Sequence, residues 1–518
     1  MMNAQVLSWA NAITGGVNGV SAASIEVDTD GNVLILGVFN GPVDLDPGPG
    51  SFMVQSPNES GQYLIKLDPD GNFIWGGSWP FIINRNVHVS NDNGILLSGW
   101  FNAGTFDIDP GPEVYNMTIT EGSGFVFKLA PDGTLAWNNQ YVGKSILDLA
   151  INSSGEIFCT GAGGGVDSFV MALTPEGELA WDYDFEGDIS YNRPADIEVT
   201  PDGDIVISGR FNDSSIDFDP GPNELILTQG YGRFMGYLLK LTGTGELIWV
   251  RPLFYTINEY DDELLGVDPL GNIILAGRID TIVDIDPGPG TYILEPIGTS
   301  SFLVKYTPDG DLLWGYRTGG GILNIEIDPQ GIIYGTGEFI GTVDFDPSNG
   351  TDMISAGGPN GNAFVQIINS DGTHVWAGAF ESSSDILNEC IAVDASGNIF
   401  AAGSYSGDID ADPGAGVTTL ENLTWWSTYI VKLQSLTTYI GDHLVLSEVQ
   451  IAPNPAVDQI IVTTSSPLTD PASIFDLKGQ LVIIKDLSST ESVIDISSLP
   501  AGEYIIKVGG SADRFVKL

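Results

Sequence analysis

The stretch "DGNVLILGVFNG" (residues 30–41) combines a tight-turn signal, an apolar run and a glycine at the end of that run. Asp-Gly and Asn-Gly pairs favour β-hairpin turns, and a short apolar run between turn signals is typical of a strand inside a sheet. The same pattern begins again at residues 93, 154, 202, 270, 330 and 396. Seven copies of one unit indicate a repeat architecture.

Each copy lies inside a longer unit that predicts four strands. An alternating or apolar run such as "SIEVD" (24–28) precedes it, and a run with a second turn, such as "YLIKLDPDGNFIW" (63–75), follows it. In the second unit the four strands are "NVHVS", "GILLSGWF", "GFVFKLA" and "TLAWNNQ". Four-stranded antiparallel units in series are the blades of a β-propeller. The sequence therefore predicts an all-β fold, with a seven-bladed β-propeller over residues 1–434.

The last unit lacks a fourth strand, and the start of the chain supplies one. A tryptophan marks the fourth strand of six units, at Trp75, Trp137, Trp181, Trp249, Trp314 and Trp376. The seventh unit ends at "STYIVKLQ" (427–434), whereas "VLSWANAIT" (6–14) carries Trp9 in the matching position. We therefore expect the N-terminal strand to complete the last blade, which closes the ring without leaving two open sheet edges.

A second motif, "VDLDPGPG" (43–50), has a copy in six of the seven units and is missing from the third. Its two aspartates are separated by one apolar residue, so in a strand both carboxylates project from one face and the apolar residue turns towards the blade. The pairs are Asp44 and Asp46, Asp107 and Asp109, Asp217 and Asp219, Asp284 and Asp286, Asp344 and Asp346, and Asp410 and Asp412, with Asp408 as a third carboxylate in the last copy.

Two hypotheses account for these carboxylates. In the first, each pair and the carbonyl oxygens of its turn form part of a weak Ca²⁺ site, since calcium takes six to eight oxygen ligands. In the second, the second aspartate accepts hydrogen bonds from turn amides, as aspartates commonly do, and the first aspartate is solvated. The spacing matches neither an EF-hand nor a calcium-binding β-helix repeat.

The units resemble the β-propeller repeats of bacterial surface proteins, on stretches such as "GFVFKLAPDGTLAW" (124–137) and "SFLVKYTPDGDLLW" (301–314). This resemblance implies the fold and says almost nothing about activity, because propellers host many functions.

The repeat stops after a linker at 435–445, and residues 446–518 alternate apolar and polar residues in short runs that predict a small Ig-like β-sandwich. The segment resembles the type A sorting domain of the type IX secretion system, on "APNP" (452–455), "IFDLKGQLV" (474–482), "IDISSLPAGEYIIKV" (494–508) and "RFVKL" (514–518). The matching residues are Pro453, Asn454, Pro455, Asp476, Gly479, Leu499, Pro500, Gly502, Tyr504, Lys507 and Lys517.

This second resemblance implies a partner and a location. The partner is the type IX secretion machinery, and the location is the outer surface of a Gram-negative bacterium or the medium. It also implies a signal peptide, but "MMNAQVLSWANAITGG" (1–16) has neither a basic n-region nor a long apolar h-region. We therefore expect a leader upstream of this sequence.

Charge and composition exclude several classes of partner. The chain carries 18 Lys and Arg against 68 Asp and Glu, a net charge of −50, which repels nucleic acid and anionic lipid. No apolar run is long enough for a transmembrane segment. Cys159 and Cys390 lie in strand-like runs and are expected to be buried free thiols.

No catalytic constellation stands out, because the three histidines are scattered and the recurrent acids follow the repeat. We expect a non-catalytic binding, adhesion or scaffold module for an extracellular protein or glycan, with Trp425 and Trp426 as candidate ligand-binding residues. The alternatives are an exported glycoside hydrolase or lyase and a structural surface-layer protein. A unique cluster of acids, histidine or arginine at one mouth of the ring would favour an enzyme, whereas a repeated surface would favour binding or structure.

Overall fold

The computed structural model has two compact units, Met1–Leu436 and Thr437–Leu518. The structure describes residues 5–517 except 17–18, 56–59, 81–85, 112, 164–167, 186–191, 213–214, 229–233, 257–263, 280, 297–300, 347–349, 358–360, 383, 415, 423, 436–448, 453–455, 465–471, 476–480, 486–490, 501 and 509–510. These residues form strands, turns and bends, with no helix among them. Within them there is accordingly no helix of the length and apolarity needed to cross a bilayer.

The first unit contains seven antiparallel sheets with four blade strands each, as the sequence predicted; the sheet of blade 6 is extended to six strands by a ribbon that follows in the chain. Blade 1 is β2 (Gly19–Val27), β3 (Val33–Asn40), β6 (Ser60–Leu67) and β7 (Phe73–Pro80); blade 2 is β8 (Val87–Val89), β9 (Ile95–Phe101), β12 (Ser123–Leu129) and β13 (Leu135–Val142). Blade 3 is β14 (Lys144–Ile151), β15 (Ile157–Gly163), β16 (Ser168–Leu173) and β17 (Leu179–Phe185); blade 4 is β18 (Asn192–Val199), β19 (Ile205–Phe211), β22 (Phe234–Leu241) and β23 (Leu247–Thr256). Blade 5 is β24 (Leu264–Val267), β25 (Ile273–Arg278), β28 (Ser301–Tyr306) and β29 (Leu312–Arg317); blade 6 is β30 (Gly321–Ile327), β31 (Ile333–Phe339), β34 (Asn362–Ile368) and β35 (His374–Ser382). Blade 7 is β36 (Ile386–Val393), β37 (Ile399–Tyr405), β40 (Ser427–Ser435) and β1 (Gln5–Ile13).

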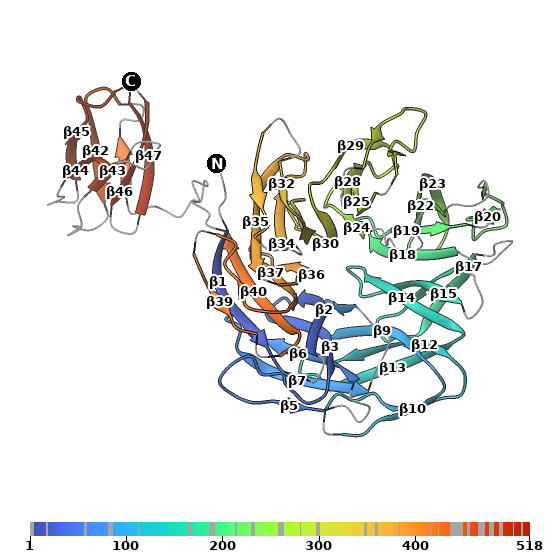
Figure 1. Cartoon of the computed structure of the whole chain (residues 1–518). Helices are drawn as coiled ribbons and strands as arrows, with labels where there is room; N and C mark the ends of the chain where they lie inside the picture. The colour runs from blue at the N-terminus through green and yellow to red at the C-terminus, as the bar shows by residue number, and fades with distance from the viewer. Residues whose placement is uncertain are drawn as a thin grey trace. The chain divides into compact units, whose positions relative to one another are not determined.

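The N-terminal strand closes the ring. Strand β1 pairs antiparallel with β40, from Gln5 opposite Ser435 to Ile13 opposite Thr428. Figure 1 shows the two strands side by side although they come from opposite ends of the propeller sequence. The prediction of a seven-bladed propeller completed by its first strand is confirmed.

The cores of the ring lie between blades, which explains why the second strands are mostly apolar. Successive side chains of a strand point to opposite faces. In β3, Val33 and Ile35 pack with Phe400 of blade 7, whereas Leu34 and Leu36 pack with residues of blade 2 such as Leu97. Both faces of such a strand are buried, so apolar residues predominate on both of them.

The recurrent tryptophan joins one blade to the next. The indole N–H of Trp9 in blade 7 donates to the carbonyl oxygen of Pro69 in blade 1, at 3.1 Å, and that of Trp75 donates to the carbonyl of Pro131 in blade 2, also at 3.1 Å. The turn glycine beneath Trp9 is Gly71, which has φ +84°, and a Cβ there would lie 3.0 Å from the indole. Both the positive φ of the turn and the close indole of Trp9 therefore require a glycine at this position.

A recurrent lysine of the third strand adds a buried polar contact. Lys66 Nζ lies 2.8 Å from Asp28 in its own blade and donates to the carbonyl of Pro131 in the next, at 3.2 Å. Lys305 makes the same bridge from Asp268, at 2.7 Å, to the carbonyl of Ser370. Both lysines are buried, and these partners stabilise the positive charge that each lysine carries there.

The second unit contains two antiparallel sheets. One is β41 (Val449–Ala452), β42 (Gln459–Thr464) and β45 (Glu491–Asp495); the other is β44 (Leu481–Lys485), β43 (Ala472–Phe475), β46 (Gly502–Val508) and β47 (Ser511–Lys517). Side chains of both sheets, including Ile460, Ile494, Ile474 and Ile506, share one core. The Ig-like topology stays a prediction, and all but Ser435 of the predicted linker lies outside the described residues.

Candidate functional site

The repeated aspartates lie on two-stranded ribbons between the second and third strands of a blade. The ribbons are β4 (Val43–Asp44) with β5 (Met53–Val54), β10 (Gly104–Asp107) with β11 (Asn116–Ile119), β20 (Ser215–Asp217) with β21 (Ile226–Thr228), β26 (Val283–Asp284) with β27 (Ile293–Leu294), β32 (Thr342–Asp344) with β33 (Met353–Ser355), and β38 (Ile409–Asp410) with β39 (Thr419–Leu420). The last ribbon also pairs with β35 of blade 6. Six blades thus carry the same addition.

The first aspartate of each pair bridges its ribbon. Asp284 Oδ1 accepts the N–H of Asp286 at 3.2 Å and the N–H of Tyr292 at 2.8 Å. The residues two and eight positions later donate in the same way to Asp44, Asp107, Asp217, Asp344 and Asp410. The expectation that this aspartate is only solvated is wrong, because the loop returns and places a second amide at the same oxygen.

The second aspartate caps the Pro-Gly turn. Asp286 Oδ1 accepts the N–H of Gly288 at 2.8 Å, and Asp46, Asp109, Asp219 and Asp412 accept the equivalent glycine N–H. The turn after Asp346 lies outside the described residues. In these five ribbons the turn-capping hypothesis accounts for one oxygen of each second carboxylate.

The orientation of the motif is confirmed, since the residue between the aspartates is buried in every copy: Leu45, Ile108, Phe218, Ile285, Phe345 and Ala411. Burial opposes ionisation of Asp44, but hydrogen bonds from Phe52, Ser51 and Asp46 outweigh it and hold the pKa of Asp44 below its ordinary value. Among the described residues no group of three or more Asp, Glu, His or Cys is arranged to hold a metal ion. Calcium binding by the ribbons stays a prediction.

The two candidate tryptophans lie in the loop between β39 and β40, and Asp408, just before β38, contacts that loop. Asp408 Oδ1 accepts the N–H of Asn422, at 3.0 Å. Trp425 is 72% exposed, whereas Trp426 is half-buried and its carbonyl oxygen accepts the N–H of Val20 in blade 1, at 3.2 Å. The loop therefore crosses the junction between the last blade and the first.

The described residues of the sorting motif divide between core and surface. Leu499 and Tyr504 are buried in the core of the second unit, and the Tyr504 hydroxyl donates to the carbonyl of Pro500 at 2.9 Å. Gly502 begins β46 opposite Lys517, which is buried, while Lys507 is exposed. The remaining motif residues, Pro453, Asn454, Pro455, Asp476 and Gly479, lie outside the described residues.

The first strands of the blades carry a set of titratable residues that sequence reasoning did not single out. These strands contact one another around the ring, which makes them its innermost strands. At one shared register, opposite the second position of the next strand, the seven blades place Glu26, His88, Ala150, Glu198, Gly266, Glu326 and Ala392. We call Glu26, His88, Glu198 and Glu326 the axial cluster. It breaks the repeat, because three blades have no side chain that titrates there.

The residues of the axial cluster have raised pKa values. Burial is the main cause that raises the pKa of Glu26 to about 6 and that of Glu198 to about 8. Glu326 is raised well above its ordinary value by burial and by the carboxylates of Glu26 and Glu198, from blades that are not its neighbours. Side chains from separate blades therefore point towards the axis of the ring.

An aspartate pair flanks this cluster. Asp148 accepts the amide N–H of Asn86 at 2.7 Å and lies 3.4 Å from His88 Nε2. Burial opposes the charge on each partner, but their interaction lowers the pKa of Asp148 and raises that of His88. Burial and the neighbouring Asp148 carboxylate raise the pKa of Asp196, whose Oδ2 accepts the N–H of Leu265 in blade 5 at 2.9 Å.

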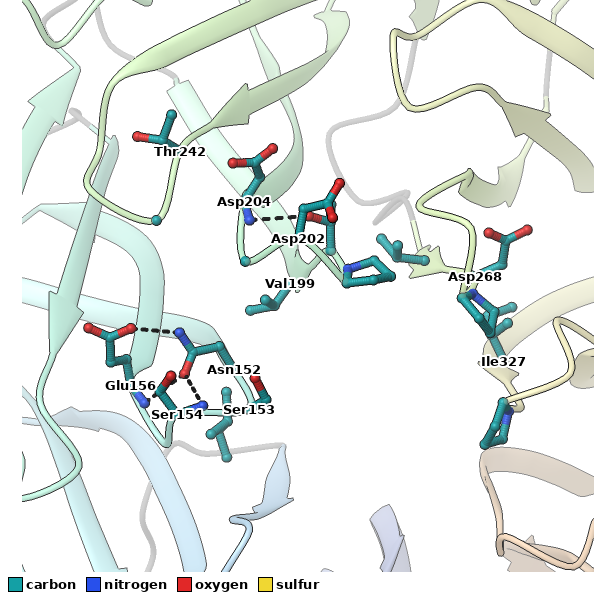
Figure 2. Close-up of a pocket in the computed structure, with 18 of the residues that line it drawn as sticks. Asn152, Ser153, Ser154, Glu156, Val199, Asp202, Asp204, Thr242, Asp268 and Ile327 are labelled. Carbon is teal, nitrogen blue, oxygen red and sulfur yellow. Dashed lines mark hydrogen bonds between the residues drawn. The ribbon is translucent and has the colours of Figure 1, made fainter.

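A recess of about 740 Å³ opens beside the ends of the first strands of blades 3 to 6. Figure 2 shows its wall of turn residues, including Asn152, Glu156, Asp202 and Asp268. Several of these side chains are tied to the turns: Asn152 donates to Glu156 at 2.7 Å, and the N–H of Asp204 donates to Thr200 at 3.1 Å. The wall is polar and acidic, which suits neither an apolar nor an anionic ligand.

Comparison with known proteins identifies the C-terminal segment. Residues 450–517 match the family model described as the secretion system C-terminal sorting domain. Together with the seven sheets, this makes the chain a β-propeller with a type IX secretion sorting tail, which places it outside the cell or on its surface.

The propeller is similar to several known proteins, and these similarities assign no activity to it. An uncharacterised WD repeat-containing protein of Acanthamoeba polyphaga mimivirus is 22% identical over 502 residues, covering 77% of this chain and 36% of the relative, so the chain spans about a third of that protein. Among solved structures, the Dos1 propeller has a TM-score of 0.41 at 9% identity, covering 82% of this chain and 94% of its own. The β-propeller domain of the Trilobed protease from Pyrococcus furiosus has a TM-score of 0.39 at 11% identity, covering 82% and 99%. A protein of unknown function from Dyadobacter fermentans has a TM-score of 0.37 at 13% identity, covering 83% and 99%.

Proposed function

We propose that this exported propeller is a non-catalytic binding module that engages an extracellular protein or glycan through the ribbons of its blades. The observation that carries the proposal is a cross-strand pair repeated on four ribbons. Asp44 is opposite Met53, Asp217 opposite Ile226, Asp284 opposite Ile293 and Asp344 opposite Met353. Residues directly opposite each other in an antiparallel pair share one face.

Each of these pairs offers an apolar contact beside a carboxylate. Met53 is 62% exposed, Met353 54%, and Ile226 and Ile293 each 49%. An exposed apolar residue next to an acceptor is the composition of a binding surface, and its repetition around the ring suits a large or repetitive partner. Several weak contacts on one rigid body raise the overall affinity far above that of one contact.

The repeated acids themselves speak against catalysis. Each first aspartate accepts two backbone amides, as described above for Asp284. Their regular recurrence follows the fold of the ribbon, whereas a catalytic pair belongs to one place in the molecule.

The axial cluster favours a second candidate, an exported enzyme acting on polysaccharide. Strongly raised pKa values of acids in a confined site are typical of general acids as well as of structural clusters. Glu198, with a pKa of about 8, is the residue that would serve as the acid. We rank this candidate second because the axial residues lie on the innermost strands of the ring, whereas the ribbons lie on the surface, where a polymer can reach them.

The test compares the full chain with a variant in which the four apolar residues are removed: Met53→Ser, Ile226→Ser, Ile293→Ser and Met353→Ser. Retention on insoluble extracellular polysaccharide and on immobilised outer-surface protein is measured for both. We expect the variant to lose at least about tenfold in retention, in line with the loss of several linked contacts, with an unchanged melting temperature. Equal retention of the two chains contradicts binding through the ribbons. Sedimentation of the chain into large self-assemblies would instead support the surface-layer alternative.

A further inference from the structure

A small recess lies at the junction where the ring closes, between blade 7 and blade 1. It measures about 240 Å³ and is lined by Ser21, Val38 and Asn40 of blade 1 and by Glu389, Ser404 and Trp426 of blade 7. We call it the seam recess. It is smaller than the usual range of about 300–1,000 Å³ for pockets that take drug-sized ligands, so it suits one small ring or group of a larger ligand.

The polar groups of the seam recess are held in fixed orientations. The Ser404 hydroxyl donates to Glu389 Oε2 at 2.8 Å. Asn40 Oδ1 accepts from the Ser60 hydroxyl at 2.6 Å, which directs the amide NH₂ of Asn40 the other way; no described residue accepts a hydrogen bond from it. The recess thus offers a carboxylate acceptor and an amide donor, the combination that recognises a hydroxyl-bearing ligand.

The loop beside the recess presents an aromatic ring to solvent on a rigid support. Trp425 is 72% exposed. Asn422 anchors the loop: its amide donates to the carbonyl of Tyr405 at 3.2 Å, and its Oδ1 accepts from the N–H of Thr424 at 2.9 Å and the Ser427 hydroxyl at 2.8 Å. A large aromatic side chain exposed on an ordered loop is a pre-organised contact, because little freedom is lost when a ligand stacks on it.

The junction also requires close approach of the two blades. Gly19 has φ +99°, and a Cβ there would lie 2.6 Å from Trp426 Cβ. The N–H of Val20 donates to the carbonyl of Trp426. Both contacts hold Trp426 against blade 1. None of the other six units has a Trp-Trp pair before its third strand, so this feature is particular to the closing blade.

From this geometry we propose that the seam recess binds a terminal pyranose of a neutral or amino-bearing glycan, with Trp425 stacking on the adjoining sugar. The sugar's hydroxyls pair with Glu389 and Asn40, and its C–H face packs on aromatic surface. Glu389 and the net charge of −50 exclude acidic sugars. The inference rests on the proposed binding function and names its ligand class, but its residues are separate from the four ribbon pairs.

Binding is measured by titration calorimetry of the full chain with neutral hexose, N-acetylhexosamine and hexosamine oligosaccharides, with a uronic acid oligosaccharide and a quaternary ammonium compound as further arms. We expect binding of a neutral or amino sugar, weakened at least about tenfold by Trp425→Ala and by Glu389→Gln, which corresponds to about 1.4 kcal/mol. Leu270→Ala, which removes an exposed large apolar side chain from the turn between β24 and β25, away from the ribbons and the seam recess, is the matched control and should leave sugar binding unchanged.

The possible outcomes separate this inference from the proposed function. Binding of none of the sugars, binding of uronic acid or quaternary ammonium alone, or sugar binding that Trp425→Ala and Glu389→Gln leave intact overturns the seam site. The ribbon proposal stands or falls separately, by the retention of the fourfold ribbon variant. Unchanged melting temperatures of the single variants exclude misfolding as the cause of a loss.

Discussion

The indole N–H of Trp9 donates to the carbonyl oxygen of Pro69 across the junction of blades 7 and 1, and the two residues stand 60 positions apart in the sequence. Lys432, the neighbour of Trp9 in the β1–β40 pairing, donates to the same carbonyl at 2.9 Å. This one carbonyl of blade 1 thus accepts hydrogen bonds from both β1 and β40, the two strands that complete blade 7. The closing junction uses the same tryptophan and lysine contacts as the junctions between blades 1 and 2 and between blades 5 and 6, although the chain is interrupted there.

Replacing Trp9 by alanine should open this junction. The indole is half-buried, so we expect a loss of roughly 1–3 kcal/mol in unfolding free energy, below the 3–5 kcal/mol typical of a fully buried aromatic residue. Chemical denaturation measures the loss. Trp9→Phe should recover part of it through packing without the hydrogen bond, and Trp425→Ala, a change at an exposed site, should cost nothing measurable. A Trp9→Ala variant as stable as the parent would contradict closure by β1.

The first aspartate of a ribbon should matter more for local order than the second. In Asp284→Ala the amides of Asp286 and Tyr292 both lose their acceptor, at a local cost of about 1–2 kcal/mol. Hydrogen exchange at the Tyr292 amide should speed up accordingly. Asp286→Ala removes the acceptor of the Gly288 amide and leaves Asp284 in place, so the Tyr292 amide should stay protected. Equal exchange in the two variants would show that the bridge has no structural effect.

Calcium should change the stability of the propeller little. One oxygen of each first aspartate already accepts two amides, and a ligand stabilises a protein only by binding the folded state more tightly than the unfolded one. We expect the same melting temperature in millimolar calcium and in chelator. A melting temperature that calcium raises in the parent, but not in the double variant Asp284→Asn, Asp286→Asn, would instead support the metal-site hypothesis.

The axial cluster should make stability fall as pH rises. Glu198 has an ordinary pKa of 4.5 and a folded-state pKa of about 8, so the folded protein binds its proton more tightly than the unfolded chain does. The resulting stabilisation is complete below pH 4.5 and is lost progressively up to about pH 8. Glu198→Gln should therefore be more stable than the parent at pH 9, by roughly 1–4 kcal/mol, and equal to it near pH 4.

Thermal melts of the two chains across this range provide the measurement. Glu246→Gln, at an exposed position in a turn, is the matched control and should not alter the pH dependence. The neighbouring groups that share the titration are Glu26, Glu326, His88 and Asp148. A parent protein whose stability is flat between pH 4.5 and 8 would show that the axial carboxylates are open to water.

The strands could be predicted from sequence because their signals are local. Turn dipeptides, the apolar runs of β3 and its counterparts, and the recurrent tryptophan specify hairpins that differ little between blades. The placement of β1 also followed, since Trp9 completes a count of seven fourth strands. The burial of Leu45 and its equivalents followed from the two-residue period of a strand.

The remaining features depend on chain segments that meet only after folding. The bridge from Asp284 to Tyr292 requires the ribbon to return, and the axial cluster requires first strands from separate blades to converge. A signal for the cluster was present: a glutamate or histidine inside an otherwise apolar first strand, as in "SIEVD", "NVHVS", "ADIEV" and "NIEID". Its meaning was hidden because the spacing within one blade gives no distance between blades.

Whether this propeller binds without catalysis is decided by measuring binding and product release in one sample. The full chain is incubated with a panel of extracellular polysaccharides, and both bound protein and newly formed reducing or unsaturated chain ends are quantified. We expect the protein to be retained on at least one polysaccharide whose chain length does not change. Shortening of the polysaccharide that Glu198→Gln abolishes would contradict this expectation and would identify the axial cluster as an active site.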